Sequence, residues 1–249
     1  MITYSTPDSN IFTDLRERLT PLLKAARSHS VCDIGGGAHP FLSMEEILAD
    51  DLLYTLLDRS SDELVKAPAE ICKVICDIAG ELNTAKDWKS GDRVVLREQF
   101  EVIFSVMLAE HIADPLAFHK NVREMLVDGG SAIHLFPTLY TVPFLVNKFL
   151  PERITLLLNR ILSPAARQTR DKFPAYYRWC RGPLPSAIRR FERLGYEVVE
   201  HRGYFGHGYY SRFPLLARVH QWKSDFLERH PVPMLTNYAI VWLRKLSDK

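Results

Sequence analysis

The chain has 249 residues, of which 47% are hydrophobic and 25% are charged, and its formal net charge is +2. This balance excludes a disordered or low-complexity chain, because enough apolar side chain is present to offset the entropy that folding removes. The 12 glycines, 15 prolines and 4 cysteines exclude collagen-like and disulfide-rich proteins, and the cysteines, with no CxxC pair and no histidine at zinc-site spacing, predict no metal site.

Short apolar runs alternate with stretches of helical periodicity through the first half of the chain. Strands are predicted at residues 30–34, 52–57, 71–76, 100–106 and 131–136. Helices are predicted at residues 8–27, 43–50, 61–67 and 115–127, and the last of these is expected to stop at the pair Gly129–Gly130. Continuous apolar strands that alternate with helices indicate a parallel sheet covered by helices on both faces.

Residues 137–182 interrupt this alternation with several prolines and a predicted amphipathic helix at 152–162. The pattern then resumes, with predicted helices at 185–194 and 214–229 and predicted strands at 195–199 and 237–243. Because no repeat or flexible linker divides the sequence, we expect one domain over residues 1–249. Residues 137–182 would form a helical, basic and apolar insertion that acts as a lid.

The charge is unevenly distributed along the chain. Residues 1–136 carry 13 Lys and Arg against 22 Asp and Glu, residues 137–193 carry 11 against 3, and residues 194–249 carry 8 against 5. The basic middle block is either a solvated helix face or a surface for an anionic partner, such as a phosphorylated substrate or a lipid head group. No nucleic-acid-binding motif accompanies it, so we expect no nucleic-acid partner.

The cysteines and the N-terminal residues give information about the cellular compartment in which the protein is located. Cys32 and Cys76 lie inside apolar runs, where buried and reduced thiols are expected. The first residues lack the basic stretch and apolar stretch of an export signal. Both observations favour the cytoplasm as the location.

Chemistry-bearing residues follow the first three predicted strands. The run Gly35–Gly37 ends the first strand, and Asp58 and Asp77 end the next two. Glycines let the backbone pass close to a ligand, and ligands of parallel sheets lie beyond the carboxyl ends of the strands. A dinucleotide turn reads GxGxxG, whereas this turn has Pro40 at the third glycine position and Asp33 before it. That arrangement disfavours a pyrophosphate and favours a cationic ligand.

Asp58 and Asp77 suit the ribose and the base of a nucleoside. Asp58 follows Gly37 by 21 residues, where a carboxylate can accept hydrogen bonds from both ribose hydroxyls. Asp77 could accept a hydrogen bond from the exocyclic amine of adenine. Each carboxylate alone could instead cap a helix or face water, but the two in register favour an adenosine site.

Four segments in this order resemble the class I S-adenosylmethionine (SAM) dependent methyltransferases, in particular the methyltransferase type 11 group with the ubiquinone/menaquinone methyltransferases. The segments are Val31–Gly37, Leu56–Asp58, Cys76–Ile78 and Phe100–Asp114. The resemblance covers roughly residues 28–136, with weaker similarity at 183–200 and 236–245. It implies an α/β fold: a Rossmann-like, doubly wound sheet of seven mostly parallel strands with an antiparallel last strand, plus a helical insertion after strand five.

The resemblance also implies SAM as the cofactor and a set of residues that bind it. The predicted cofactor-binding residues are Asp33, Gly35, Gly36 and Gly37 along the methionine moiety, Asp58 with the adjacent Arg59 at the ribose, Asp77 and Ile78 at the adenine, and Ser105, Val106 and Met107 beside the sulfonium. The sequence departs from the family at His39, where a third glycine is common.

Methyl transfer to a hydroxyl needs in-line alignment with the methyl carbon and a base that works near neutral pH. His111, just past the fourth strand, is the candidate base, and a structural role is the alternative. The candidate acceptor-binding residues are Tyr140, Tyr177, Tyr204 and His207. The last two belong to an aromatic, glycine-rich run after strand six, which could instead be an aromatic edge of the core.

The sequence therefore predicts a SAM-dependent methyltransferase that acts on a small-molecule acceptor, an anionic sugar or other metabolite. One alternative is a lipid-like acceptor, with residues 138–162 lying on the membrane surface, since amphipathic helices bind anionic interfaces. An NAD-linked oxidoreductase is a second alternative. A non-catalytic protein that keeps the fold is a third.

Overall fold

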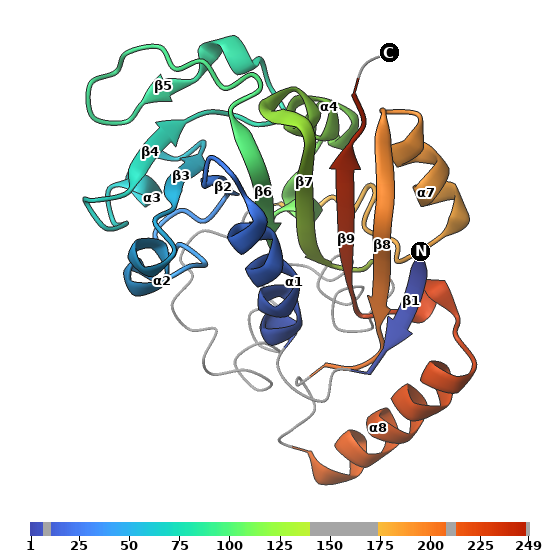
Figure 1. The fold of residues 1–249 in the computed structure, drawn as a ribbon. Coiled ribbons are helices and arrows are strands. Elements are labelled where there is room, and N and C mark those ends of the chain that lie inside the picture. The colour runs from blue at the N-terminus through green and yellow to red at the C-terminus, as the bar shows by residue number, and fades with distance from the viewer. Residues whose placement is uncertain (7–10, 140–173, 208–212, 248–249) are drawn as a thin grey trace.

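The computed structural model describes residues 1–6, 11–139, 174–207 and 213–247 (Figure 1). In these residues nine strands form one sheet, in the order β1-β8-β9-β7-β6-β2-β3-β4-β5. The strands are β1 (Ile2–Ser5), β2 (Ser30–Ile34), β3 (Leu53–Asp58), β4 (Cys72–Ile75), β5 (Lys86–Asp87), β6 (Phe100–Val106), β7 (Leu126–Pro137), β8 (Tyr196–Tyr204) and β9 (Tyr238–Lys245). The helices are α1 (Ile11–Ala25), α2 (Met44–Ala49), α3 (Ser61–Leu64), α4 (Pro115–Met125), α7 (Pro185–Glu192) and α8 (Pro214–Arg229), with short 3₁₀ helices η1 (Leu82–Thr84), η2 (Ala109–His111) and η5 (Pro233–Leu235).

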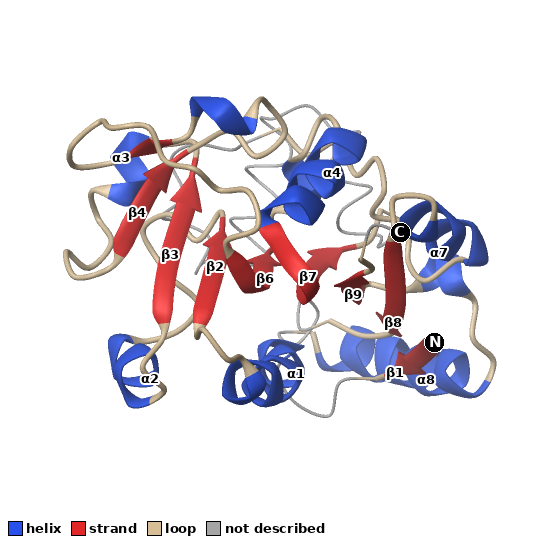
Figure 2. Cartoon of the chain, turned by 45° about the horizontal axis from the view of Figure 1, so that its top comes forward, coloured by secondary structure: helices blue, strands red, loops and turns tan. Residues whose placement is uncertain are grey.

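Both faces of the sheet are buried, because successive residues of its central strands belong to different cores. Val31 and Phe104 pack in the core under α1, whereas their neighbours Cys32 and Ile103 pack in the core under α4. Figure 2 shows α1 and α2 on one side of the sheet and α4 on the other. The predicted doubly wound α/β architecture is therefore confirmed.

The directions of the strands also follow the prediction. β2 pairs in parallel with β3 and β6, β3 with β4, and β6 with β7, while β9 is antiparallel to both of its neighbours, β7 and β8. The seven predicted strands are present with a reversed last strand. Two further strands extend the sheet: β1 lies parallel to β8, and β5 lies antiparallel to β4. They were not predicted because four and two residues are too few to show a periodicity.

The predicted end of the helix at 115–127 is wrong. α4 ends at Met125, and Leu126 already belongs to β7. The pairing of β6 with β7 shifts register between Phe100 and Val102, and Gly129 in the opposite strand has φ +77°. The glycine pair therefore serves a bulge at the start of β7 rather than a helix stop, since a bulge often needs a left-handed residue.

Part of the predicted insertion can be compared with the structure. Residues 174–182 contain no helix or strand, while the predicted helix at 152–162 lies outside the described residues. Among the helices that the structure describes, none is long and apolar enough to cross a membrane.

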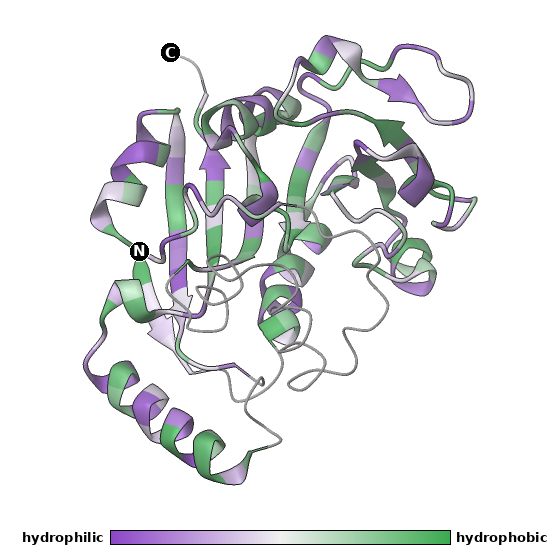
Figure 3. Cartoon of the chain, turned by 180° about the vertical axis from the view of Figure 1, so that it is seen from behind, coloured by the Kyte–Doolittle hydropathy of each residue, from purple (hydrophilic) through white to green (hydrophobic). Residues whose placement is uncertain are grey.

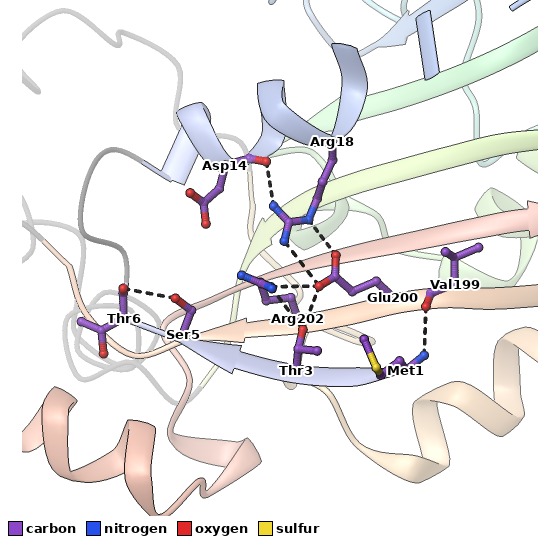
Figure 4. A network of polar contacts seen from close by, with 9 residues as sticks. All are labelled: Met1, Thr3, Ser5, Thr6, Asp14, Arg18, Val199, Glu200 and Arg202. Atoms are coloured by element: carbon purple, nitrogen blue, oxygen red, sulfur yellow. Dashed lines mark hydrogen bonds and ion pairs between the residues drawn. The ribbon is translucent and has the colours of Figure 1, made fainter. Parts of the chain in front are cut away.

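A polar network holds the N-terminal strand β1 against β8 and α1 (Figure 4). The Glu200 carboxylate accepts hydrogen bonds from Arg18 Nε (2.7 Å), Thr3 Oγ1 (2.8 Å) and Arg202 Nε (2.9 Å). Burial alone would raise the pKa of Glu200. The hydrogen bonds and the two nearby guanidinium charges outweigh burial and lower the pKa to about 2.

Replacing Glu200 with glutamine is expected to lower the free energy of unfolding at pH 7 by about 1–2 kcal/mol, because the charge that three donors contact is removed. In the wild-type protein this stabilisation is present above the ordinary pKa of 4.5 and is lost as the pH falls towards the folded-state pKa of about 2. Urea unfolding of both proteins, at neutral and at acid pH, measures the difference. Equal stabilities at pH 7 would contradict the role of this network.

Candidate functional site

A cavity of about 360 Å³ opens at the carboxyl ends of β2, β3, β4 and β6. Its volume is in the range of sites for small molecules and cofactors. Residues from the predicted set that line it are Gly35, Gly36, Gly37, Asp58, Arg59, Asp77, Ile78, Met107 and His111. The sheet thus brings together, in one hollow, residues that are up to 76 positions apart in the sequence.

The turn after β2 is built so that only glycine fits. Gly35 has φ +80°, and a Cβ on it would stand 2.8 Å from the side chain of Leu108. A Cβ on Gly36 would stand 2.7 Å from Asp33 Oδ2. The Gly35 amide donates a 2.7 Å hydrogen bond to the carbonyl of Leu57 in the neighbouring strand. The turn therefore presents bare backbone to the cavity at a fixed position.

Asp33 lies beneath this turn and does not line the cavity. Its Oδ2 accepts hydrogen bonds from the hydroxyl of Tyr54 (2.6 Å) and from the amide of Phe41 (3.0 Å). Burial raises the pKa of Asp33 to about 6, although both hydrogen bonds act to lower it. The side chain therefore braces the loop from the inside, and the structure does not place it where the methionine moiety was predicted.

Asp58 ends β3 at the wall of the cavity. Its Oδ1 accepts a 2.8 Å hydrogen bond from the amide of Ser60, and its Oδ2 faces the turn, 3.3 Å from where a Cβ on Gly37 would stand. Burial is the main influence on this carboxyl and raises its pKa. Burial therefore disfavours the ionised form of Asp58, and a carboxylate in such a partly desolvated position at a cavity wall is typical of a ligand-binding site.

The loop after β4, the strand next to β3, carries Asp77 and Ile78 to the wall of the cavity. Asp77 is exposed and accepts a 3.0 Å hydrogen bond from the amide of Ala79, while Ile78 is buried. Asn121 of α4 donates hydrogen bonds to the carbonyls of Ile78 (2.8 Å) and Gly80 (2.7 Å), which fixes this loop. Sequence reasoning missed Asn121, because a polar residue on an amphipathic helix gives no sign of what it binds.

Of the three residues predicted beside the sulfonium, only Met107 lines the cavity. It has φ +52°, and its amide donates to the carbonyl of Leu135. Ser105 is fully buried, with its Oγ 2.8 Å from His134 Nδ1, and Val106 packs against the core under α1. Ser105 and Val106 lie within β6, where side chains point to the faces of the sheet, whereas Met107 follows the strand and reaches its edge.

His111 ends η2 and lines the cavity. Its Nδ1 lies 3.1 Å from the carbonyl oxygen of Pro174, which can only accept, so Nδ1 carries the ring proton. Nε2 of the neutral ring then holds the lone pair that a base requires. It lies 3.7 Å from Oε1 of Glu110, a carboxyl whose pKa is raised to about 8 by burial, which favours its protonated form.

Of the four predicted acceptor-binding residues, the three that the structure describes do not line the cavity. Tyr177 is buried in the core, and its neighbour Tyr176 lines the cavity instead. Tyr204 is fully buried on the side of α1, and His207 stacks on His220 of α8 with ring centroids 4.1 Å apart. Tyr140 lies outside the described residues. The cavity wall also includes residues that sequence reasoning missed, namely Glu63, Leu108, Ile112 and Pro174.

Comparison with known proteins identifies the family. A family model described as a methyltransferase domain matches residues 8–221. No curated protein sequence matches the chain. A SAM dependent methyltransferase from Archaeoglobus fulgidus has a similar structure, with a TM-score of 0.55, 15% identity, and coverage of 94% of this chain and 93% of that one.

Two other similar structures have more specific names. Geranyl diphosphate C-methyltransferase from Streptomyces coelicolor A3(2) gives a TM-score of 0.54 at 8% identity, covering 94% of this chain and 77% of that one. Phosphoethanolamine N-methyltransferase 2 from Haemonchus contortus gives a TM-score of 0.53 at 14% identity, covering 98% of this chain and 54% of that one. At these identities the likeness shows the fold, while the family model excludes the NAD-linked oxidoreductase. The chain belongs to the methyltransferase domain family and is a SAM-dependent methyltransferase of class I.

Proposed function

We propose that the cavity at the carboxyl edge of the sheet binds SAM, with the ribose at Asp58, the adenine between Asp77 and Ile78, and the sulfonium towards Met107. One observation supports this proposal. The glycine turn, Asp58, the pair Asp77 and Ile78, and Met107 lie at the ends of four strands and line the same cavity. The group fits the residues present, because a cavity of about 360 Å³ is lined by the backbone of the glycine turn, by the carboxylates of Asp58 and Asp77, and by apolar Ile78. When bound, SAM supplies a methyl group on a positively charged sulfur.

The residues of the chain then bind and orient the cofactor. The two oxygens of Asp58 can each accept from a ribose hydroxyl, and a partly buried carboxylate makes stronger hydrogen bonds than one in water. Ile78 offers an apolar surface for the adenine ring, and Asn121 keeps its loop in place. The bare backbone of the glycine turn approaches the methionine moiety.

A thermal-shift comparison of SAM with NADH tests the cofactor assignment. At about 100 times its dissociation constant, SAM is expected to stabilise the protein by about 2.7 kcal/mol, which raises the Tm by about 5–10 °C. NADH is expected to leave the Tm unchanged. Stabilisation by NADH alone would overturn the assignment, and no response to SAM would favour a non-catalytic protein that keeps the fold.

We further propose a small, anionic acceptor that loses its proton to Nε2 of His111. The hydrogen bond from Nδ1 to Pro174 fixes the tautomer that such a base requires, and His111 shares the cavity with Met107. The exposed guanidinium of Arg59 at the cavity wall and the basic block at 137–193 favour a negatively charged acceptor. Two proteins of similar fold are named for anionic acceptors, phosphoethanolamine and geranyl diphosphate.

Replacing His111 with glutamine is expected to lower kcat by about 100-fold or more, because general-base catalysis contributes about that much. The dissociation constant for SAM should change less than twofold. S-adenosylhomocysteine release measures turnover, with a protein-free aqueous metabolite extract as the source of acceptor. His230→Gln, at an exposed histidine outside the cavity lining, is the matched control and should leave kcat unchanged. An unaltered kcat in the His111 variant would assign this residue a structural role, and turnover supported only by a lipid extract would contradict the small-molecule acceptor.

A further inference from the structure

Helix α8 stands apart from the sheet, at the same edge as the cavity. It follows β8, which ends at Tyr204, and precedes the antiparallel β9, which begins at Tyr238, so both of its connections lie at the carboxyl edge of the parallel strands. Figures 1 and 3 show α8 beyond the ends of these strands. Ser224 and Leu227 are buried, and they mark the side that faces the protein.

The outward side of α8 carries a stripe of large apolar side chains. Leu215, Val219, Trp222 and Phe226 follow the spacing i, i+4, i+7 and i+11, which places them on one face of a helix. Their exposed fractions are 77%, 58%, 70% and 50%, respectively. The rings of Trp222 and Phe226 stack with centroids 6.1 Å apart. In Figure 3 this helix shows hydrophobic residues, in green, among hydrophilic ones. A contiguous apolar surface of this kind marks an interaction site.

Cationic side chains border this stripe on both edges. At 100° per residue, Arg218 and Arg229 fall along one edge of the stripe, with Asp225 just beyond them, and Lys223 falls along the other edge. A helix with Trp, Phe and Leu on one face and Lys and Arg beside it is typical of helices that lie in the plane of a membrane interface. Trp222 near the middle of the stripe fits that setting, because tryptophan prefers the head-group level.

The charges distinguish between the possible partners. If α8 paired with α8 of a second copy, Arg218, Lys223 and Arg229 of each helix would lie near those of the other, and Asp225 is the one carboxylate at these edges that could offset them. Residues 140–173 carry 6 Lys and Arg against 2 Asp and Glu, so this segment of the chain has the same sign of charge. An anionic lipid surface has the opposite sign and also accepts the apolar side chains.

We propose that α8 binds anionic membranes, with its apolar stripe inserted at the boundary between head groups and acyl chains and its arginines and lysine against the head groups. The inference goes beyond the proposed function, since it holds for a water-soluble and for a lipid acceptor alike. Because α8 and the cavity share one edge of the sheet, membrane binding brings the cavity close to the bilayer.

Co-sedimentation with vesicles tests this proposal. The wild-type protein is expected to bind vesicles of equal parts phosphatidylcholine and phosphatidylglycerol at least tenfold more tightly than vesicles of phosphatidylcholine alone. The double variant Val219→Glu, Trp222→Glu should lose at least tenfold in affinity for the anionic vesicles. Leu48→Glu, on exposed α2, adds a carboxylate at a side chain that is 72% exposed and is the matched control, with wild-type binding. The SAM-induced thermal shift should be the same in all three proteins, which separates this result from the cofactor assignment.

Three results would overturn the proposal. The first is that the wild-type protein fails to sediment with anionic vesicles, and the second is that the double variant binds them as tightly as the wild type does. The third is that the protein is a dimer in solution that the double variant converts to monomers, with no vesicle binding, which would make a second copy the partner of this face.

Discussion

Replacing Asp58 with alanine is expected to weaken SAM binding at least tenfold, as measured by isothermal titration calorimetry. The carboxylate stands at the cavity wall, with Oδ2 towards Gly37, where it can accept hydrogen bonds from ribose hydroxyls. A hydrogen bond that involves a charged group contributes about 1.5–3 kcal/mol, and about 1.4 kcal/mol corresponds to a factor of ten.

The stability of the ligand-free protein separates a binding role from a structural one. Because burial raises the pKa of Asp58, the ionised carboxyl costs free energy in the folded state, and its removal should leave the Tm unchanged or slightly higher. Asp62→Ala removes an exposed carboxylate four residues further along, in α3, and is the matched control with wild-type affinity. An unchanged titration of the Asp58→Ala protein would contradict the assignment of the ribose.

Replacing Asp33 with alanine is expected to lower the free energy of unfolding by about 2–4 kcal/mol and the Tm by about 10 °C. The buried carboxylate accepts from the Tyr54 hydroxyl and the Phe41 amide, and without it both donors are left in the interior with no acceptor from this residue. The glycine turn rests on the same side chain, so SAM affinity should also fall. Thermal and urea unfolding measure the first effect and calorimetry the second.

Two further substitutions show whether Asp33 acts through its hydrogen bonds or its charge. Asp33→Asn keeps an acceptor of the same size and should recover most of the stability and the SAM affinity. Tyr54→Phe removes one hydrogen bond and should cost about 1 kcal/mol. If the asparagine variant binds SAM as weakly as the alanine variant while it is as stable as the wild type, the charge itself acts on the sulfonium, and the bracing role is wrong.

The sequence predicted which strand ends carry the site better than it predicted which side chains enter it. Parallel strands put their carboxyl ends at one edge, so Gly35, Asp58 and Asp77 come together wherever the strands are correctly located. The direction of a side chain near a strand end depends on the last pleat and on tertiary partners. Asp33 turns towards Tyr54, and Ser105 turns towards His134, for reasons that no local pattern contains.

Helix α8 shows a second limit of prediction from periodicity. The helix predicted at residues 214–229 is present as α8, and Leu215, Val219, Trp222 and Phe226 are spaced to lie on one face of it. The same spacing says nothing about what covers that face, and in the structure the stripe points away from the protein. The short strands β1 and β5 were missed for the opposite reason, since pairing with a neighbour, and not their own sequence, makes them strands.

The most direct test of the site is a crystal structure of the protein with S-adenosylhomocysteine. The ribose hydroxyls are predicted to lie within hydrogen-bond distance of Asp58, the adenine against Ile78 beside Asp77, and the sulfur towards Met107 and His111. A ligand bound elsewhere on the molecule, or one bound in this cavity with its ribose turned away from Asp58, would contradict the central claim that the four strand ends form the cofactor site.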